Sequence, residues 1–256
     1  MDSSGQAKMN DTKRFRDFYA EEANVYHRLR YESRYGKLFQ LLHHEGISET
    51  LGRLDRDLSL LEVACGTGHT SALLVELGFS LLACDLTPEM LTQAMERVKT
   101  VHEVNGKFLE SDVTSLPFPD SSFDLVVSTR FLHLFPHKEQ RKLLREMLRI
   151  LRPGGYILVD FDNWSSRWIM ALPYLIYNLV RYRRIAPYSI YNRINPTKRV
   201  FEELGVRVQR ITGIGGTHLI LPALISQDLA FWFGRLHKTN PLRILAEQFI
   251  VFGTKS

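Results

Sequence analysis

Short apolar runs alternate with amphipathic segments through the first 160 residues. A helix is predicted over 87–100, with Thr87 as its N-cap and Pro88 at its first position. A second helix is predicted over 137–151, where leucines share one face before the Arg-Pro-Gly-Gly of 152–155 ends it. Apolar runs predict strands at 58–64, 79–85, 106–111, 123–128 and 155–160. Such alternation predicts a mostly parallel sheet covered by helices on both faces.

A tight turn follows the first predicted strand and contains Gly66 and Gly68. Glycine there indicates close approach of a ligand to the backbone, at the carboxyl ends of the strands where such folds bind ligands. Asp85 ends the second strand, where a carboxylate can accept both hydroxyls of a ribose, although an acid that starts the next helix is the alternative. Position 71 is Ser71, so the three-glycine dinucleotide fingerprint is incomplete.

Four segments resemble, in order, the motifs of the class I S-adenosylmethionine-dependent methyltransferases. They are LLEVACGTGHTS (60–71), LLACDLTPEML (81–91), FLESDVTSLPFPDSSFDLVVSTRFLHLF (108–135) and RILRPGGYILVD (149–160). The segments 196–214 and 247–256 resemble the last helix and the closing hairpin of that family. The resemblance implies an α/β, Rossmann-like, doubly wound seven-stranded sheet. It would be mostly parallel with an antiparallel last strand, and would carry helical substrate-lid insertions.

The same resemblance implies S-adenosyl-L-methionine as methyl donor, with no metal. Glu62 would help to anchor the methionine ammonium, Asp85 the ribose, and Asp112 the adenine amino group. Leu86 is either a wall of the adenine slot or a core residue, and Asp112 is alternatively a turn cap. Tyr19 and Tyr26 would close over the cofactor, or their helix only covers the edge of the sheet. The expected cofactor-binding residues are Tyr19, Tyr26, Glu62, Ala64, Gly66, Gly68, Asp85, Leu86, Asp112 and Val113.

Methyl transfer needs few side chains, because the sulfonium is already activated and the protein mainly aligns the acceptor. His133 lies in the loop after the fourth strand and is a candidate general base for a hydroxyl acceptor. A structural histidine that packs this loop is the favoured alternative. Arg130, in the same loop, is expected either to pair with an acidic substrate or to face solvent.

The expected division of the chain is an N-terminal helical lid at 1–50 and a methyltransferase core at 51–256. Substrate insertions are expected at about 161–196 and 213–246, and they mix aromatic residues with arginines. Residues 161–256 carry a net charge of +8, whereas the first 160 carry −3. The candidate substrate-binding residues are Arg130, Trp168, Tyr177 and Arg183.

An apolar surface with a basic border suits a small hydrophobic acceptor with an acidic or lipid-like group, or contact with an anionic membrane. An RNA methyltransferase is the rival, since aromatics and arginines also bind bases. A non-catalytic S-adenosylmethionine-binding module and an NAD-dependent dehydrogenase are further alternatives. The sequence does not indicate an oligomeric state.

The amino-acid composition indicates an ordinary globular protein and not a disulfide-rich or membrane-spanning one. An apolar fraction of 45% and a charged fraction of 24% over 256 residues are typical of a globular domain. Two cysteines, Cys65 and Cys84, do not make a disulfide scaffold, and the polar N-terminus lacks a signal-like apolar region. The 13-residue apolar stretch 168–180 is too short to span a bilayer. A cytoplasmic protein is therefore expected.

Overall fold

The fold is organised around one mixed sheet, described here from a computed structural model. The structure describes residues 16–23, 25–28, 30–101, 106–165, 190–216, 219, 225–238 and 241–256. The strands are β1 (Leu60–Val63), β2 (Leu81–Asp85), β3 (Gly106–Glu110), β4 (Phe123–Ser128), β5 (Leu151–Asn163), β6 (Tyr191–Asn192), β7 (Val206–Ile214) and β8 (Gln248–Lys255). The helices are α2 (Arg34–Leu51), α3 (His69–Glu76), α4 (Pro88–Lys99), α5 (His137–Ile150), α7 (Ile194–Glu203) and α9 (Gln227–Arg235), with 3₁₀ turns η1 (Leu132–Leu134), η3 (Leu236–Lys238) and η4 (Leu242–Leu245).

Seven strands follow one another in the order β3-β2-β1-β4-β5-β8-β7. The pairs of β1 with β2 and β4, of β2 with β3 and of β4 with β5 are parallel, whereas β8 runs antiparallel to both β5 and β7. The expected doubly wound sheet with an antiparallel last strand is confirmed. The two-residue strand β6 is an addition, and it pairs in parallel with the end of β5.

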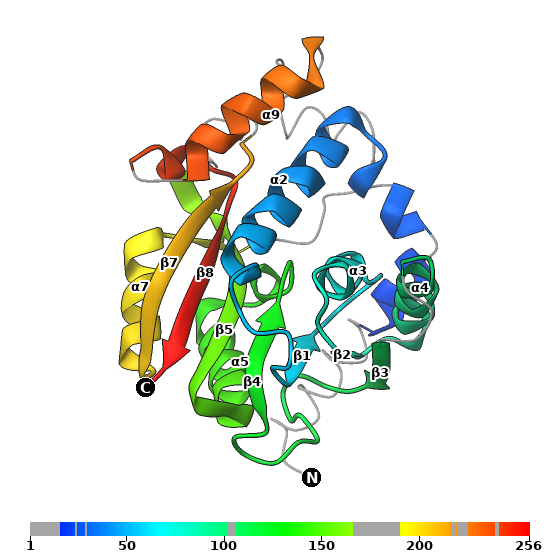
Figure 1. Cartoon of the computed structure of the whole chain (residues 1–256), viewed down its shortest axis with the longest axis vertical. Coiled ribbons are helices and arrows are strands. Elements are labelled where there is room, and N and C mark those ends of the chain that lie inside the picture. The colour runs from blue at the N-terminus through cyan, green and yellow to red at the C-terminus, as the bar shows by residue number, and fades with distance from the viewer. Residues whose placement is uncertain are drawn as a thin grey trace.

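Side chains of successive strand residues enter two separate cores. Leu60, Leu125 and Leu158 pack with α2, α3 and α4 on one face, and Leu61 and Val126 pack with α5 and α7 on the other. The near-continuous apolar strands that the sequence shows are the consequence of this two-sided burial. In Figure 1, β7 and β8 lie on the left of the sheet and β3 on the right, with α2 beside α9 above.

The fifth strand begins earlier than the sequence indicates. It starts at Leu151, directly after α5, so Arg-Pro-Gly-Gly is part of β5 instead of a separate turn. The pairing with β4 shifts register between Phe123 and Leu125, and Gly154 has a φ of +78°. Residues 152–155 of β5 therefore stand opposite the single residue Asp124 of β4, which is three more residues than regular pairing has. The left-handed Gly154 lies within this irregular stretch, and pairing resumes at Tyr156.

The helix α2 packs on the sheet and is not confined to a lid. Ser33 caps it by accepting a hydrogen bond from the backbone N–H of Gly36 (2.9 Å), and Leu38, Ile47 and Leu51 are fully buried in the first core. Of the segment 1–50, the helical residues 16–23 and 25–28 contribute Tyr19 and Tyr26 to a pocket instead. The domain division itself stays a prediction.

Within the described ranges, none of the helices is both long and apolar enough to cross a membrane. The apolar stretch 168–180 lies outside the described residues.

Candidate functional site

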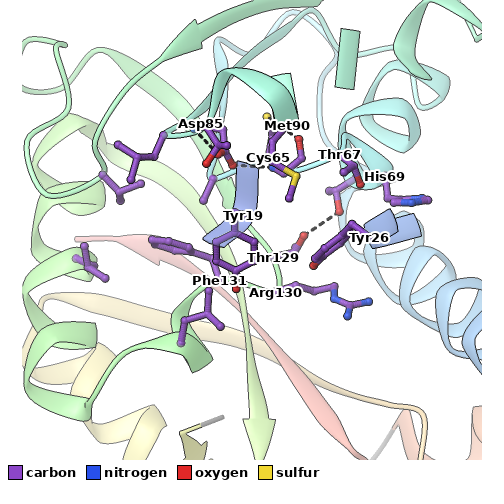
Figure 2. Close-up of a pocket in the computed structure, with 18 of the residues that line it drawn as sticks. Tyr19, Tyr26, Cys65, Thr67, His69, Asp85, Met90, Thr129, Arg130 and Phe131 are labelled. Atoms are coloured by element: carbon purple, nitrogen blue, oxygen red, sulfur yellow. Dashed lines mark hydrogen bonds between the residues drawn. The ribbon is translucent and has the colours of Figure 1, made fainter. Parts of the chain in front are cut away.

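A pocket of about 1040 Å³, part of it open to solvent, lies at the carboxyl ends of β1, β2, β3 and β4. Figure 2 shows Asp85 and Met90 on one side of it, Tyr26 and His69 on the other, Tyr19 across the middle, and Arg130 and Phe131 below. Nine residues expected from the sequence line it: Tyr19, Tyr26, Ala64, Gly66, Asp85, Leu86, Asp112, Val113 and Arg130. The structure therefore brings together residues that are spread over more than a hundred positions.

The turn between β1 and α3 forms the floor of the pocket. Ala64, Gly66 and Gly68 have φ values of +57°, +53° and +76°. A Cβ on Gly66 would meet nothing within 4 Å, whereas a Cβ on Gly68 would lie 2.6 Å from the Cα of Ala94 in α4. Gly66 therefore leaves room for a ligand, while Gly68 lets α3 begin against α4 and does not line the pocket.

Asp85 fastens this turn to the end of β2. Its Oδ2 accepts from the backbone N–H of Gly66 (2.8 Å) and its Oδ1 from that of Thr87 (3.0 Å). Burial raises the pKa of the carboxyl, and these two N–H groups act against that rise. The Thr87 side chain and the Leu86 backbone also lower the pKa of Asp85, so the loop after β2 surrounds the carboxyl with donors on one side while it lines the pocket on the other.

Glu62 lies beneath the turn and does not line the pocket. Its Oε2 accepts a hydrogen bond from the Ser71 hydroxyl (2.5 Å). Ser71 stands where the dinucleotide fingerprint has its third glycine, and its side chain is used to bind Glu62. Burial raises the pKa of Glu62 to about 8, and the Ser71 hydrogen bond opposes the rise. The expected contact of Glu62 with a methionine ammonium stays a prediction.

The pocket has an apolar wall next to a polar floor. Asp112 accepts at Oδ1 from the N–H of Thr114 (2.8 Å), which shapes the loop after β3. Thr67 is buried, and its Oγ1 has no partner among the residues that the structure describes.

Further residues line the pocket that the sequence analysis did not predict. They are Tyr31, Cys65, Thr67, His69, Thr70, Thr87, Met90, Thr114, Thr129, Phe131, Leu134, Phe135 and Leu143. Most are sequence neighbours of the motifs, which is the signal that could have found them.

An aromatic chain closes the pocket. The ring centroids of Tyr19 and Tyr26 are 6.5 Å apart, and those of Tyr26 and Tyr31 are also 6.5 Å apart. Tyr31 contacts His69 at 4.0 Å between centroids, and His27 stacks on His69 at 5.1 Å. Pairings of this kind leave no periodic trace in a sequence, so the contact between Tyr31 and His69 could not be predicted from it, although His69 itself lies in the segment 60–71.

Hydrogen bonds fix the protonation of the histidine stack. The Gln40 amide nitrogen lies 2.8 Å from Nδ1 of His69, so this Nδ1 accepts. The Nε2 of His69 then donates to Nδ1 of His27 across 3.1 Å, and both rings are neutral. Burial lowers the pKa of His69 to about 2, with the nearby Arg97 guanidinium acting in the same direction.

Arg130 has a left-handed backbone, with a φ of +58°. Its backbone N–H donates to Oδ1 of Asp160 (2.7 Å), and its Nη1 donates to the Tyr31 hydroxyl (2.9 Å). Its guanidinium lies 5.1 Å from the Tyr31 ring centroid, and its Nε is buried with no partner in the described ranges. A strained residue with an unused donor on the pocket wall is consistent with a binding role.

His133 is buried in η1 and is not among the lining residues. Burial lowers its pKa, although Asp162 and Asp160 oppose the shift. Its role as a base stays a prediction.

The predicted substrate-binding residues Trp168, Tyr177 and Arg183 lie outside the described residues. Across the parts of the chain described, no cluster of three or more His, Cys, Asp or Glu side chains could hold a metal ion.

Comparison with known proteins points to one family. A family model described as "Methyltransferase domain" matches residues 61–159. The chain is 33% identical over 119 residues to the 2-methyl-6-phytyl-1,4-hydroquinone methyltransferase of a Synechocystis strain, which covers 46% of this chain and 35% of that protein. It is 40% identical over 100 residues to the demethylmenaquinone methyltransferase of Clavibacter sepedonicus, which covers 39% of each. The matches thus span between about a third and two fifths of these curated relatives.

Solved structures share the fold over a greater length. The magnesium protoporphyrin IX methyltransferase of Synechocystis PCC 6803 with bound SAH superimposes with a TM-score of 0.68 at 14% identity. That superposition covers 96% of this chain and 100% of the other. A SAM-dependent methyltransferase from Thermotoga maritima gives a TM-score of 0.63 at 16% identity, covering 93% and 98%.

The two glycines of the turn are expected to differ in their effect on stability. Gly66→Ala should lower the free energy of unfolding by about 1 kcal/mol, the cost of a Cβ at positive φ. Gly68→Ala should lower it by about 2–4 kcal/mol, because the same cost adds to overpacking against Ala94. Urea unfolding of the ligand-free variants measures both, and equal losses would contradict the assignment.

Acid should destabilise the protein through the buried His69 and the partly buried His44. The folded pKa values of His69 and His44 are about 2 and about 4, both below the value near 6.5 of an unfolded chain. The unfolded state therefore binds more protons below pH 6.5, and each histidine costs about 1.4 kcal/mol of stability per pH unit there. Urea unfolding at pH 7 and pH 5 should show a smaller loss for His69→Asn than for the wild type. An unchanged loss would show that His69 takes up protons while folded.

Proposed function

We propose that this chain, whose residues 61–159 belong to the methyltransferase-domain family, is an S-adenosylmethionine-dependent methyltransferase acting on a small hydrophobic acceptor. The observation that carries the proposal is the pairing of Gly66 with Asp85 at one end of the pocket. Gly66 leaves space above the backbone, and Asp85 lines the pocket with a carboxylate, the group that accepts from the two hydroxyls of a ribose.

The residues present suit each part of this donor. Asp85 would hold the ribose, and Asp112 and Val113 would border the adenine, with Leu86 and Met90 as apolar walls. The methionine part would approach the turn at the free space above Gly66 and at the unpartnered hydroxyl of Thr67. Tyr19 and Tyr26 would cover the bound molecule and exclude water.

The donor, when bound, supplies an electrophilic methyl group on a sulfonium. The protein's contribution is to align a nucleophile with that methyl group in a dry pocket. Phe131, Leu134, Phe135 and Leu143 give the pocket an apolar end that suits a hydrophobic acceptor. Relatives are named for acceptors with large apolar parts, among them a phytyl hydroquinone and demethylmenaquinone. An RNA acceptor and a non-catalytic binding module are outcomes that the experiments below separate from this proposal.

Contact with an anionic membrane surface is part of the proposal. Large apolar side chains are exposed on α9 and η4, including Trp232 (57% exposed), and Ile225 (81%) is exposed two residues before α9. The net charge of +8 in residues 161–256 complements anionic lipid, and such a surface would give access to lipid-soluble acceptors.

Binding of S-adenosylmethionine should depend on Asp85. Calorimetry should show that Asp85→Ala weakens the affinity at least tenfold, about 1.4 kcal/mol. Asp57→Ala is the matched control, because Asp57 is exposed and precedes the amino end of β1, whereas the pocket lies at the carboxyl end of that strand, and it should bind like the wild type. Unchanged affinity in Asp85→Ala would refute the ribose assignment. A folded wild type that binds NAD and not S-adenosylmethionine would overturn the function.

Methyl transfer should label apolar molecules. With methyl-labelled donor and separate lipid, small-metabolite and RNA fractions, label should enter organic-soluble product, and faster when the lipids are presented in anionic vesicles. The double variant Ile225→Ser, Trp232→Ser should lose the vesicle advantage and keep the rate in detergent. Label only in RNA, reduced steeply by salt, would identify a nucleic-acid enzyme instead. Donor binding without label in any fraction would favour the binding module.

A further inference from the structure

The guanidinium of Arg130 lies on the pocket wall without an opposing carboxylate. Arg130 lines the pocket and forms no salt bridge with any residue that the structure describes. Two acids of β5 are engaged elsewhere. Asp160 accepts at Oδ1 from the backbone N–H of Arg130 and at Oδ2 from His43 Nε2 (2.9 Å), and Asp162 accepts from Gln248 (2.7 Å). A buried cation without a counter-charge is costly, so an anion from outside the protein would stabilise it.

The unused donors of this guanidinium lie on one edge of the group. Nη1, the nitrogen on the Cδ side, donates to the Tyr31 hydroxyl (2.9 Å). Nε is buried without a partner, and within the described ranges Nη2 has none either. Nε and Nη2 share the edge of a guanidinium that binds both oxygens of a carboxylate by two parallel hydrogen bonds. The pattern of used and unused nitrogens therefore fits a carboxylate.

The surroundings hold the Arg130 side chain in this position before anything binds. Its guanidinium carbon lies 5.1 Å from the ring centroid of Tyr31 and 5.7 Å from that of Phe39. Its backbone has a φ of +58° and is fixed by the hydrogen bond to Asp160. A left-handed conformation costs a non-glycine residue about 1 kcal/mol, and such strain clusters at binding sites.

The donor carries a carboxylate of its own, and the turn after β1 offers that group a separate place. The N-cap of α3 is Gly68, which has no side chain to cap the first N–H groups of the helix. The buried hydroxyl of Thr67 beside it has no partner in the part of the chain that the structure describes. Uncapped N–H groups at a helix N-terminus bind anions. Figure 2 shows Thr67 and Asp85 in the upper part of the pocket and Arg130 in the lower part.

We propose that Arg130 selects a methyl acceptor that carries a carboxylate on an apolar body, and that Nε and Nη2 bind this carboxylate as an anchor. This inference rests on the proposed function and names its substrate class. The atom that receives the methyl group is a different one, because two charged hydrogen bonds make the carboxylate a weaker nucleophile. The apolar body would contact Phe131 and Leu134, which follow Arg130 in the chain and line the pocket with it.

Other cations reinforce this choice of acceptor. The guanidinium of Arg30 lies 4.8 Å from the ring centroid of Tyr26, another lining residue. The sequence 163–196, within the expected substrate insertion, contains five arginines and no acidic residue. A protonated amine would be repelled by Arg130, and an uncharged acceptor would leave the guanidinium without a counter-charge. An apolar acid satisfies both the charge and the apolar wall.

Binding of 2-naphthoate to the protein saturated with S-adenosylhomocysteine tests the anchor. 2-Naphthamide has nearly the same shape and no charge, so it is the matched neutral ligand. Naphthalene fluorescence at pH 7 should show that the wild type binds 2-naphthoate about tenfold or more tightly than 2-naphthamide, because the charge-assisted pair of hydrogen bonds is made only by the acid.

Variants assign this preference to Arg130. Arg130→Gln should weaken 2-naphthoate binding by about tenfold or more and change 2-naphthamide binding by less than about twofold. Arg130→Lys keeps the charge without the two-pronged edge, so it should keep only part of the preference. Arg53→Gln is the matched control, because Arg53 is exposed and precedes the amino end of β1, away from the pocket, and it should bind both compounds like the wild type.

The outcomes separate this inference from the proposed function. Failure of the wild type to bind S-adenosylhomocysteine overturns the function and the inference with it. Normal binding of that product overturns the inference alone if 2-naphthoate binds no more tightly than 2-naphthamide, or if the preference survives in Arg130→Gln. A loss of about tenfold in S-adenosylhomocysteine affinity in Arg130→Gln would assign the guanidinium to the donor's carboxylate and also overturn it. If circular dichroism shows that Arg130→Gln does not fold, Arg130→Lys decides, and an undiminished preference there contradicts the inference.

Discussion

The hydrogen bond from the backbone N–H of Gly66 to Asp85 is the constraint on which the pocket depends. It joins the end of β1 to the end of β2 and holds a turn in which Ala64, Gly66 and Gly68 are all left-handed. Without a carboxylate to accept this N–H, the turn would bury an unpaired donor at the point where a ligand must approach. The close approach of Gly68 to Ala94 lets α3 start directly against α4, which sets the position of the pocket floor.

Burial near this turn also raises the pKa values of carboxyl groups. Glu62 and Glu247 both lie where desolvation raises the carboxyl pKa, to about 8 and about 7, but their neighbours differ. Glu62 bonds to Ser71 beneath the turn and supports it from below. Glu247 accepts from the Tyr35 hydroxyl of α2 and precedes β8. The neutral histidine stack over the pocket closes it without adding a charge close to a sulfonium.

The sequence predicts those features that local patterns encode. Strand and helix alternation predicts the sheet, and Asp85 and Gly66 can be assigned because they flank predicted strand ends. The pattern could not separate the two glycines, because the difference between Gly66 and Gly68 is made by Ala94 in a distant helix. Nor could it find the Tyr35–Glu247 pair, whose members are 212 residues apart. The early start of β5 was missed because a bulge lets glycine and proline stay in a strand.

A structure of the protein crystallised with S-adenosylhomocysteine tests the central claim most directly. The account predicts ribose hydroxyls within hydrogen-bonding distance of both Asp85 oxygens, with the amino-acid tail over Gly66 and the rings of Tyr19 and Tyr26 closed above. A ligand bound elsewhere, or one that leaves Asp85 bonded only to the Gly66 and Thr87 backbone, would contradict it.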